Sequence, residues 1–283
     1  MNVNSKPKAH AWQQMKRLRK VEQNFSGWSY SYDWAKNYNL LENRIGESWG
    51  NIHTVYTPEP IEIRQNASGD IECRIVDCQD CEYVTDFDTK FGRFHSDNNG
   101  EFGGELILPS GNIIGGNFSL VFDFDNKVYA IDSMRHMCLG HFKLYEFFDS
   151  DSQHCIYDVG GFGRHSKESL DFQGIFIEKN ELYILIGGEI LLNGKDAKKY
   201  GDTYKCLSRL LMVTNGKVKE CLEIEEAFDS VQNIIIANNH LHVAADKLLA
   251  VIDIVNGDKE YYTFIGEEAE HNLLSTHENF VYE

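Results

Sequence analysis

Most of the chain after about residue 50 alternates short apolar runs with polar turns, a pattern typical of β-strands. Three apolar runs are each followed by a turn that ends in Asn, at Asn126, Asn180 and Asn239, and by a second apolar run that begins two residues later. A fourth copy closes the sequence at 273–282, with Glu in the Asn position. The repeat therefore predicts a series of similar β-hairpins.

A second hairpin follows each of the first three copies. Asn-Gly pairs lie between apolar runs at 215–216 and 256–257, and the polar residues 149–152 take the same place in the first repeat. Asn-Gly is a strong hairpin signal because both central residues of the favoured turn need φ > 0. Two hairpins in each repeat make four strands, and four-stranded units that recur every ~40–50 residues are typical of β-propeller blades.

We therefore expect an all-β protein in which residues 49–283 form a β-propeller of about five, or six, four-stranded blades. The fourth copy lacks an outer hairpin, which the predicted strands 61–64 and 71–76 could supply from the N-terminal side. Pairing N- and C-terminal strands in one blade would close the ring and remove exposed sheet edges. The alternative architecture is a pair of β-sandwiches, which would not require the repeat.

The N-terminal segment has a different pattern. Residues 1–21 contain six basic and no acidic side chains, and apolar residues recur at three-residue spacing from Trp12 to Val21. This spacing predicts a short amphipathic helix within a helical N-terminal segment, residues 1–48. A transit peptide or a nucleic-acid-binding arm is one interpretation. The remaining chain has 21 basic and 44 acidic residues, a net charge of -23. We therefore favour a helix that packs on that acidic body.

The composition excludes several classes of protein. The 283 residues are 42% hydrophobic and have a formal net charge of -17, as in a soluble globular protein with ample material for a core. The negative charge disfavours direct binding to nucleic acid phosphates or anionic membranes. No apolar run approaches the ~20 residues of a membrane span, and the N-terminus lacks the apolar region of a secretory signal. We expect a cytoplasmic protein.

The seven cysteines predict reduced thiols, because their number is odd and they are spread through strand-like segments. Cys78 and Cys81 form a CxxC with Cys73 nearby, but a zinc site needs further ligands and no second CxxC or HxxxH follows at suitable spacing. A second group of His and Cys lies within 136–141, and a structural role is favoured there too. We expect no metal and no cofactor.

Enzyme motifs are absent from the sequence: it has no GxSxG, P-loop or HExxH, and no GxGxxG between a strand and a helix. We therefore expect that the chain is not an enzyme. The alternative is a glycoside hydrolase, in which carboxylates of different pKa meet in the central funnel of a five-bladed propeller. The candidate funnel carboxylates are Asp86, Asp88, Asp123, Asp125 and Asp132.

Three acidic runs predict a partner-binding surface. They comprise Asp77, Asp80, Glu82, Asp86 and Asp88; Glu220, Glu223, Glu225, Glu226 and Asp229; and Glu267, Glu268 and Glu270. Any single run is explained by a solvated face. Three runs on so acidic a chain favour a basic protein partner, since acidic surface speeds encounter with a cationic protein and imitates the phosphates that its active site binds.

The acidic, all-β character of residues 50–283, together with these acidic runs, resembles the immunity proteins of bacterial contact-dependent growth inhibition systems. The partners of EndoU-type nuclease toxins are the members of that class most similar in character. The resemblance implies a one-to-one toxin inhibitor that covers the basic, RNA-binding site of the nuclease. Acidic loops would pair with Lys and Arg of the toxin, and exposed aromatic side chains would anchor the complex.

Overall fold

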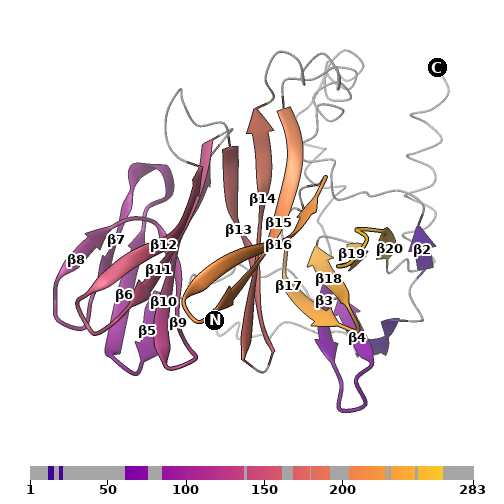
Figure 1. Cartoon of the computed structure of the whole chain (residues 1–283), viewed down its shortest axis with the longest axis horizontal. Coiled ribbons are helices and arrows are strands. Elements are labelled where there is room, and N and C mark those ends of the chain that lie inside the picture. Colours follow the sequence, from indigo (N-terminus) through magenta and orange to yellow (C-terminus); the bar gives the residue numbers. More distant parts are fainter. Residues whose placement is uncertain are drawn as a thin grey trace, which may run out of the picture. The chain divides into compact units, whose positions relative to one another are not determined.

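The computed structural model describes the strands β1 to β20 and a short 3-10 helix, η3 (Gly100–Phe102), so the all-β prediction is confirmed (Figure 1). The described residues are 12–15, 19–21, 61–75, 85–136, 139–160, 168–178, 180–191, 204–226, 228, 231–245 and 248–263. No helix in this part of the chain is long and apolar enough to cross a membrane.

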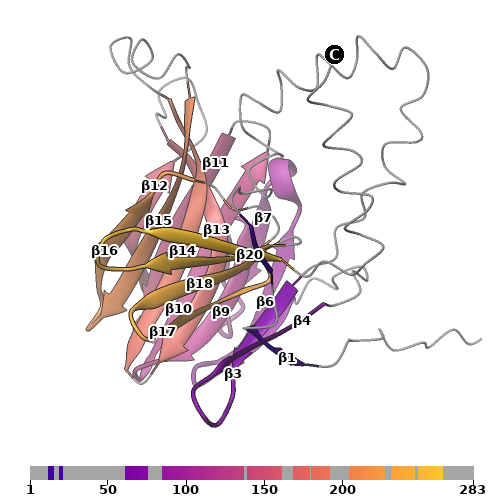
Figure 2. The same cartoon turned by 90° about the vertical axis from the view of Figure 1, so that its right-hand side faces the viewer.

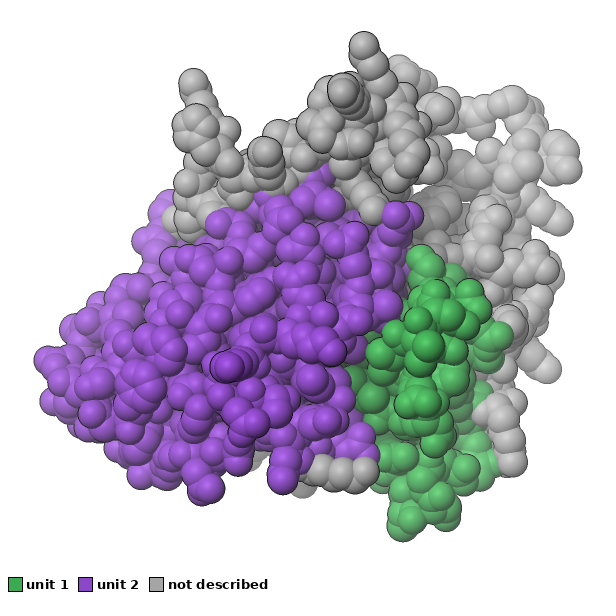
Figure 3. Space-filling view, viewed as in Figure 1, with its two compact units in different colours: residues 1–26, 49–79, 230–283 green, residues 27–48, 80–229 purple. Residues whose placement is uncertain are grey.

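The chain divides into two compact units (Figure 3). Unit 1 contains residues 1–26, 49–79 and 230–283, and unit 2 contains residues 27–48 and 80–229. Strands β1 to β4 and β17 to β20 belong to unit 1, and strands β5 to β16 belong to unit 2.

Unit 2 contains three antiparallel sheets of four strands, in each of which consecutive strands are neighbours. The first sheet consists of β5 (Asp86–Thr89), β6 (Gly92–Asn98), β7 (Gly104–Ile107) and β8 (Ile113–Gly115). The second consists of β9 (Phe118–Phe124), β10 (Lys127–His136), β11 (Leu139–Phe147) and β12 (Gln153–Gly160). The third consists of β13 (Glu168–Glu178), β14 (Glu181–Leu191), β15 (Tyr204–Thr214) and β16 (Lys217–Ile224).

Unit 1 contains two sheets. One has the order β1 (Gln13–Gln14), β4 (Ile71–Ile75), β3 (Ile61–Gln65). The other has the order β17 (Asn233–Ala237), β18 (His240–Ala245), β19 (Leu248–Asp253), β20 (Lys259–Thr263), β2 (Arg19–Val21). The predicted four-strand repeat is thus found in four sheets, one of which has an added fifth strand.

Three turns form as their Asn residues predict: the repeat turns at Asn126 and Asn239, and the Asn-Gly turn at 215–216. Asn126, Asn215 and Asn239 have φ values of 54°, 52° and 63°. Their hairpins join β9 to β10, β15 to β16 and β17 to β18. Asn tolerates this left-handed conformation better than most residues, which explains the recurrence of Asn in the repeat.

The turn at 256–257 is longer than predicted. Strand β19 ends at Asp253, two residues before the predicted end of the strand at residue 255. The turn to β20 therefore contains more residues than the predicted Asn-Gly pair. The Asp253 carboxylate accepts hydrogen bonds from the backbone N–H groups of Val255 at 2.7 Å and Asn256 at 3.3 Å. This side-chain bonding offers the backbone an alternative to the strand ladder, so the strand stops early.

Gly216 allows a close approach that other residues would disturb. Its φ is +72°, and an added Cβ would lie 2.5 Å from Glu146 Oε2 and 2.6 Å from Lys127 Nζ, two atoms of adjoining ion-paired side chains. We expect Gly216→Ala to lower the free energy of unfolding by about 1–3 kcal/mol, from backbone strain plus the clash. Gly111→Ala is the matched control, since Gly111 also has positive φ but has nothing within 4 Å of its added Cβ. Urea denaturation should show the larger loss for Gly216→Ala; equal losses would contradict the role of the close contact.

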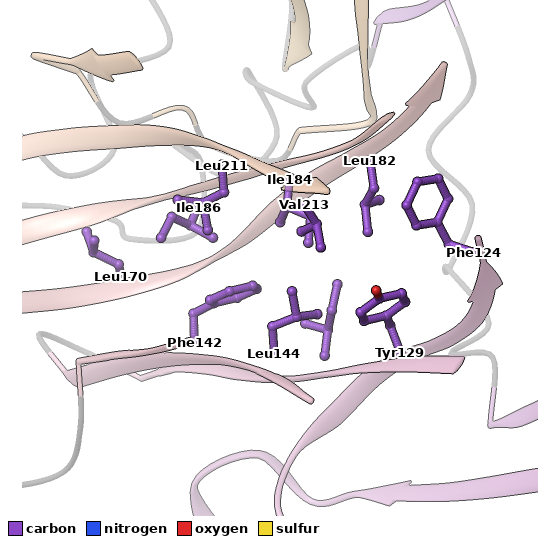
Figure 4. Packing of buried hydrophobic residues seen from close by; sticks show 11 residues of the cluster. Phe124, Tyr129, Phe142, Leu144, Leu170, Leu182, Ile184, Ile186, Leu211 and Val213 are labelled. Carbon is purple, nitrogen blue, oxygen red and sulfur yellow. The ribbon is translucent and has the colours of Figure 1, made fainter. Parts of the chain in front are cut away.

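The sheets of unit 2 pack face to face in chain order, β9 against β5, β6 and β7, and β13 against β10, β11 and β12 (Figure 1, Figure 2). Between the second and third sheets, Phe142, Leu144 and Tyr129 face Leu182 and Ile184 in a buried apolar cluster (Figure 4). Because the second sheet is covered on both sides, its inner strand β10 is apolar at consecutive positions instead of alternate ones.

On the opposite side, the second sheet packs against the first through another buried cluster. Phe94 and Phe147 meet there edge to face, with ring centres 5.1 Å apart. Both clusters lie within unit 2. The first is built largely from residues that the repeat predicts as strands, whereas Phe87, Phe94 and Leu106 of the second lie outside the predicted copies of the repeat.

In unit 1 the first sheet in the sequence packs on the last, through β3 against β17 and β18. The Asn233 side chain joins them, because its Oδ1 accepts from the Ile63 N–H at 3.1 Å and its Nδ2 donates to the Ile63 carbonyl at 2.6 Å. The predicted pairing of 273–282 with the 61–76 hairpin involves residues outside those described.

The helix predicted from Trp12 to Val21 is wrong for the described part of this segment. Residues 13–14 pair with β4, and residues 19–21 pair with β20. The Trp12 ring lies under two guanidinium groups, those of Arg64 at 4.2 Å and Arg74 at 4.4 Å. Pairing with two available sheet edges, together with this cation–π contact, outweighs the helical spacing. The rest of 1–48 lies outside the described residues.

Candidate functional site

The predicted partner-binding residues divide into two groups. Those outside the described part of the chain are Asp77, Asp80, Glu82, Asp229, Glu267, Glu268 and Glu270. Those that the structure places are Asp86, Asp88, Glu220, Glu223, Glu225 and Glu226.

The two described acids of the first run pair with their neighbours on β6. Asp88 accepts hydrogen bonds from Arg93 Nε at 2.9 Å and Nη2 at 3.1 Å, and this arginine lowers the pKa of the Asp88 carboxyl. Asp86 Oδ1 lies 3.0 Å from His95 Nδ1. All four side chains are exposed, so these pairs add little stability. Part of the predicted acidic surface is therefore already paired with cationic or titratable groups of the same sheet.

Acids of the second run meet at Arg209, a residue of β15. Glu168 at the start of β13 binds the guanidinium with two hydrogen bonds, at 2.9 Å to Nη1 and 2.7 Å to Nη2. Glu220 and Glu223 of β16 bring carboxylate oxygens to 4.0 Å and 3.7 Å from Arg209 Nε. The Tyr157 hydroxyl on β12 donates to Glu220 Oε1 at 2.8 Å. We call these five residues the Arg209 cluster.

The Arg209 cluster is buried at its centre and open at one side. The Arg209 side chain is 13% exposed, whereas those of Glu220 and Glu223 are 52% and 53% exposed. The hydrogen bonds that Arg209 donates to Glu168 raise the pKa of Arg209, and burial and the hydrogen bond to Glu220 raise the pKa of Tyr157. Two half-exposed carboxylates of the edge strand β16 thus lie within ion-pair distance of the guanidinium, and a cationic group from outside can also reach them.

Glu225 and Glu226 follow β16 and differ in burial. Glu225 is exposed, but the Glu226 side chain is buried, at 7% exposed, so Glu226 does not belong to the acidic surface as predicted. A tight turn, with the Glu226 N–H bonded to the Ile224 carbonyl at 2.7 Å, directs this residue inward. A run of acidic residues in the sequence does not show which side chain of such a turn points to solvent and which points inward.

Sequence reasoning missed the residues that organise this cluster: Glu168, Arg209 and Tyr157. Arg209 stands alone as a charge within the apolar stretch 207–213, and an isolated charge inside an apolar strand was the available signal. Glu168 and Tyr157 gave no such signal, because Glu168 reaches Arg209 from another strand of the same sheet and Tyr157 reaches it through the packing of the β9–β12 sheet against the β13–β16 sheet.

Four of the five predicted funnel carboxylates hydrogen-bond to a neighbouring group, and the fifth, Asp125, lies in a turn. Asp123 accepts hydrogen bonds from the Lys90 N–H at 3.3 Å and 3.2 Å, and Asp125 lies in the β9–β10 turn with φ of 47°. Asp132 is buried, with Oδ1 2.8 Å from His141 Nε2 and 2.7 Å from the Asn117 N–H. Asp86 and Asp88 pair as described above. None of the five lines the unit 1 pocket described below.

His141 belongs to the group 136–141 that was considered as a metal site. Its Nε2 contacts Asp132, and its carbonyl accepts from Ser133 Oγ at 3.2 Å. Ser133 Oγ in turn accepts from the Phe172 N–H at 2.8 Å, which links β10 to β13. The described residues contain no group of three or more His, Cys, Asp or Glu side chains arranged to hold a metal ion.

A pocket of about 400 Å³ lies in unit 1. It is lined by Gln14, Met15, Gly69, Asp70, Ile71, Ala237, Asn238, His240, His242 and Val251. The His242 side chain is buried, and desolvation lowers its pKa to about 4. The imidazole is therefore neutral at pH 7.

This burial predicts a pH-dependent stability. Between pH 6.5 and pH 4 the unfolded chain binds a proton at His242 that the folded chain does not bind, so the free energy of unfolding falls as pH drops through this window. The expected loss from His242 is up to about 3 kcal/mol. Urea denaturation of wild type and His242→Phe at pH 7 and pH 4.5 measures this loss. Other titrating groups contribute equally to both proteins, so the difference between the two losses is due to His242. An equal loss in both proteins would contradict the prediction.

No protein-family model matches the chain, and no curated protein shows significant sequence similarity to it.

Proposed function

We propose that the chain is an acidic protein-binding module that neutralises a basic protein partner one-to-one, as an immunity protein neutralises a nuclease toxin. The observation that supports this most directly is the Arg209 cluster, in which three carboxylates converge on one guanidinium and two of them remain half exposed. The formal net charge of -17 shows that acidic residues also outnumber basic residues over the chain as a whole. Carboxylates held in place before binding lose less conformational entropy when a cationic side chain arrives.

The fold that this proposal uses is a closed β-propeller of five blades. Four supporting features are the consecutive strand order of the four-stranded sheets, their face-to-face packing in unit 2, and, in unit 1, the packing of the first sheet on the last and the pairing of β2 with β20. A closed ring makes the two units unfold together, so calorimetry should give one cooperative transition. Two separate transitions would contradict closure.

The mechanism is occlusion. The negative field of the chain speeds encounter with a cationic partner, and the carboxylates of Glu220, Glu223 and Glu225 then pair with Lys and Arg side chains that the toxin uses to bind RNA phosphates. The toxin is inhibited because its substrate and this chain compete for the same basic surface. No catalytic step by this chain is required.

Affinity capture followed by an activity assay tests the proposal. The untagged chain is immobilised, lysate of a native host that is expressing its toxins is passed over it, and retained proteins are identified. We expect one small basic protein, and we expect its ribonuclease activity to disappear as the chain is added to one equivalent. Absence of a retained basic protein, or a retained nuclease that stays active, would overturn the proposal.

Charge neutralisation then locates the interface. Glu223→Gln combined with Glu225→Gln removes two exposed charges of the second acidic run, one of them within the Arg209 cluster, and Asp97→Asn combined with Asp258→Asn removes two exposed charges elsewhere. We expect the first pair to slow association at least 10-fold at low salt, with a smaller effect at high salt because salt screens the attraction. The control pair should change the rate less than 3-fold. Equal effects of both pairs would remove this surface from the interface.

A further inference from the structure

An aromatic side chain of unit 2 is exposed at the turn between β11 and β12. Phe148 directly follows β11 and is 57% exposed. The exposed His154 ring, near the start of β12, stacks on it with ring centres 4.9 Å apart and an angle of 5° between the planes. Because His154 covers one face of the Phe148 ring, the exposed area of that ring lies mainly on its other face and its edges.

Hydrogen bonds hold this turn in one conformation. The Phe148 N–H donates to the Ser152 carbonyl at 2.9 Å, which closes the turn. Asp149 Oδ1 accepts from the backbone N–H groups of Asp151 at 2.8 Å and Ser152 at 2.7 Å. Phe148 is therefore held both by its backbone and by the stacked imidazole, so it loses little conformational entropy when another molecule binds to it.

The two carboxylates of the turn are hydrogen-bonded to neutral donors. Asp151 Oδ1 accepts from Ser110 Oγ at 2.8 Å and from Asn112 Nδ2 at 2.7 Å, both between β7 and β8. The donors to Asp149 are backbone N–H groups, and these bonds lower the pKa of the Asp149 carboxyl. Neutral donors leave the charge of a carboxylate in place, so the turn presents net negative charge beside the exposed aromatic ring.

An aromatic face beside fixed negative charge suits a cationic side chain. The quadrupole of the ring attracts a cation above its face, and the planar guanidinium of Arg also stacks on the ring. We propose that the exposed face of Phe148 binds an Arg side chain of the basic partner, and that Asp149 and Asp151 stabilise its charge. This inference rests on the proposed function, since the basic partner supplies the arginine.

The position of Phe148 makes it continuous with the proposed interface. His154, which stacks on it, and Tyr157 of the Arg209 cluster are three residues apart on β12, or about 10 Å along the strand. β12 is an edge strand of its sheet, so a partner that lies along this edge can reach both places. Phe148 would then supply an aromatic anchor beside an acidic surface, and aromatic side chains and Arg are prominent among such anchors.

Arginine and lysine peptides test the site without the toxin. Fluorescein-labelled hexa-arginine and hexa-lysine are titrated with the untagged, full-length chain at low salt, and fluorescence anisotropy gives both affinities. The two peptides have the same formal charge, so the ratio of their affinities reports stacking of guanidinium groups more than general attraction to an acidic chain. We expect wild type to prefer hexa-arginine, and Phe148→Ala to reduce this preference about 2- to 5-fold.

Phe102→Ala is the matched control, because Phe102 is another exposed phenylalanine of unit 2, at 87% exposed. Its preference should equal that of wild type. Phe148→Leu keeps an apolar side chain without an aromatic face, so it should lose the preference as Phe148→Ala does. An unchanged preference in Phe148→Ala, or an equal reduction in Phe102→Ala, would overturn the Phe148 site.

The acids of the turn are tested by charge removal. Asp149→Asn combined with Asp151→Asn keeps side-chain oxygens that accept hydrogen bonds, and it should weaken the binding of both peptides because the ring remains while the charge is lost. Unchanged binding of both peptides would overturn the role of the acids. The peptide assay is independent of the affinity capture, so a capture that retains no basic protein would overturn the proposed function while the Phe148 site is decided by the peptides.

Discussion

Replacing Arg209 with Met is expected to lower the free energy of unfolding by about 2–4 kcal/mol, because the change leaves carboxylates near one another without the cation that they share. Glu168 makes two hydrogen bonds to this guanidinium, and the Arg209 side chain is largely buried. The value lies below that of a fully buried ion pair, since Glu220 and Glu223 are half exposed and solvent screens their interaction. Urea denaturation measures the loss.

The salt dependence of the Arg209→Met destabilisation distinguishes electrostatic repulsion among the carboxylates from the loss of side-chain packing. Added NaCl screens the repulsion among Glu168, Glu220 and Glu223, so the destabilisation of Arg209→Met should shrink between low and high salt. Arg93→Met is the matched control: Arg93 also makes two hydrogen bonds to one carboxylate, that of Asp88, but both side chains are exposed, and we expect a loss of less than about 1 kcal/mol. Losses of similar size in the two variants would contradict a structural role for the Arg209 cluster.

Truncating Phe142 to Ala is expected to destabilise the protein most, by about 3–5 kcal/mol. Phe142 is fully buried between the β9–β12 sheet and the β13–β16 sheet, where it belongs to the same cluster as Leu170 and Ile186 (Figure 4). Its removal leaves a cavity that the paired strands cannot close without shifting register. Thermal and urea denaturation should both show the loss.

Phe148→Ala is the control for this second prediction. Phe148 belongs to the same hairpin, but it is 57% exposed and only stacks on His154. Its loss should be under about 1 kcal/mol. If Phe148→Ala were as destabilising as Phe142→Ala, the core of unit 2 would lie elsewhere than between these two sheets.

Local sequence determined the hairpins of this protein. Asn126, Asn215 and Asn239 each stand where the backbone needs positive φ, and apolar runs on both sides of these turns become paired strands. Turn conformation and the alternation of strand residues depend on neighbours within a few positions, so one sequence contains the information. The number of strands in each repeat follows from the same signals.

The tertiary structure determined the secondary structure of segments whose partners lie far away in the sequence. The segment from Trp12 to Val21 has helical spacing, yet residues 13–14 and 19–21 become strands, because the edges of β4 and β20 accept their backbone hydrogen bonds. No local signal in the segment reports that these edges are available. Secondary structure at a sheet edge is set by the partner as much as by the residues themselves.

The candidate site shows the same division. The acids Glu220 and Glu223 are visible in the sequence as part of an acidic run, but their meeting point at Arg209 arises from the register of β15 with β16. The contribution of Glu168 comes from another strand of that sheet, and Tyr157 from a different sheet. Glu226 lies in the same acidic run but turns inward. Charge is a property of composition, whereas the position and exposure of each charge depend on contacts between residues far apart in the chain.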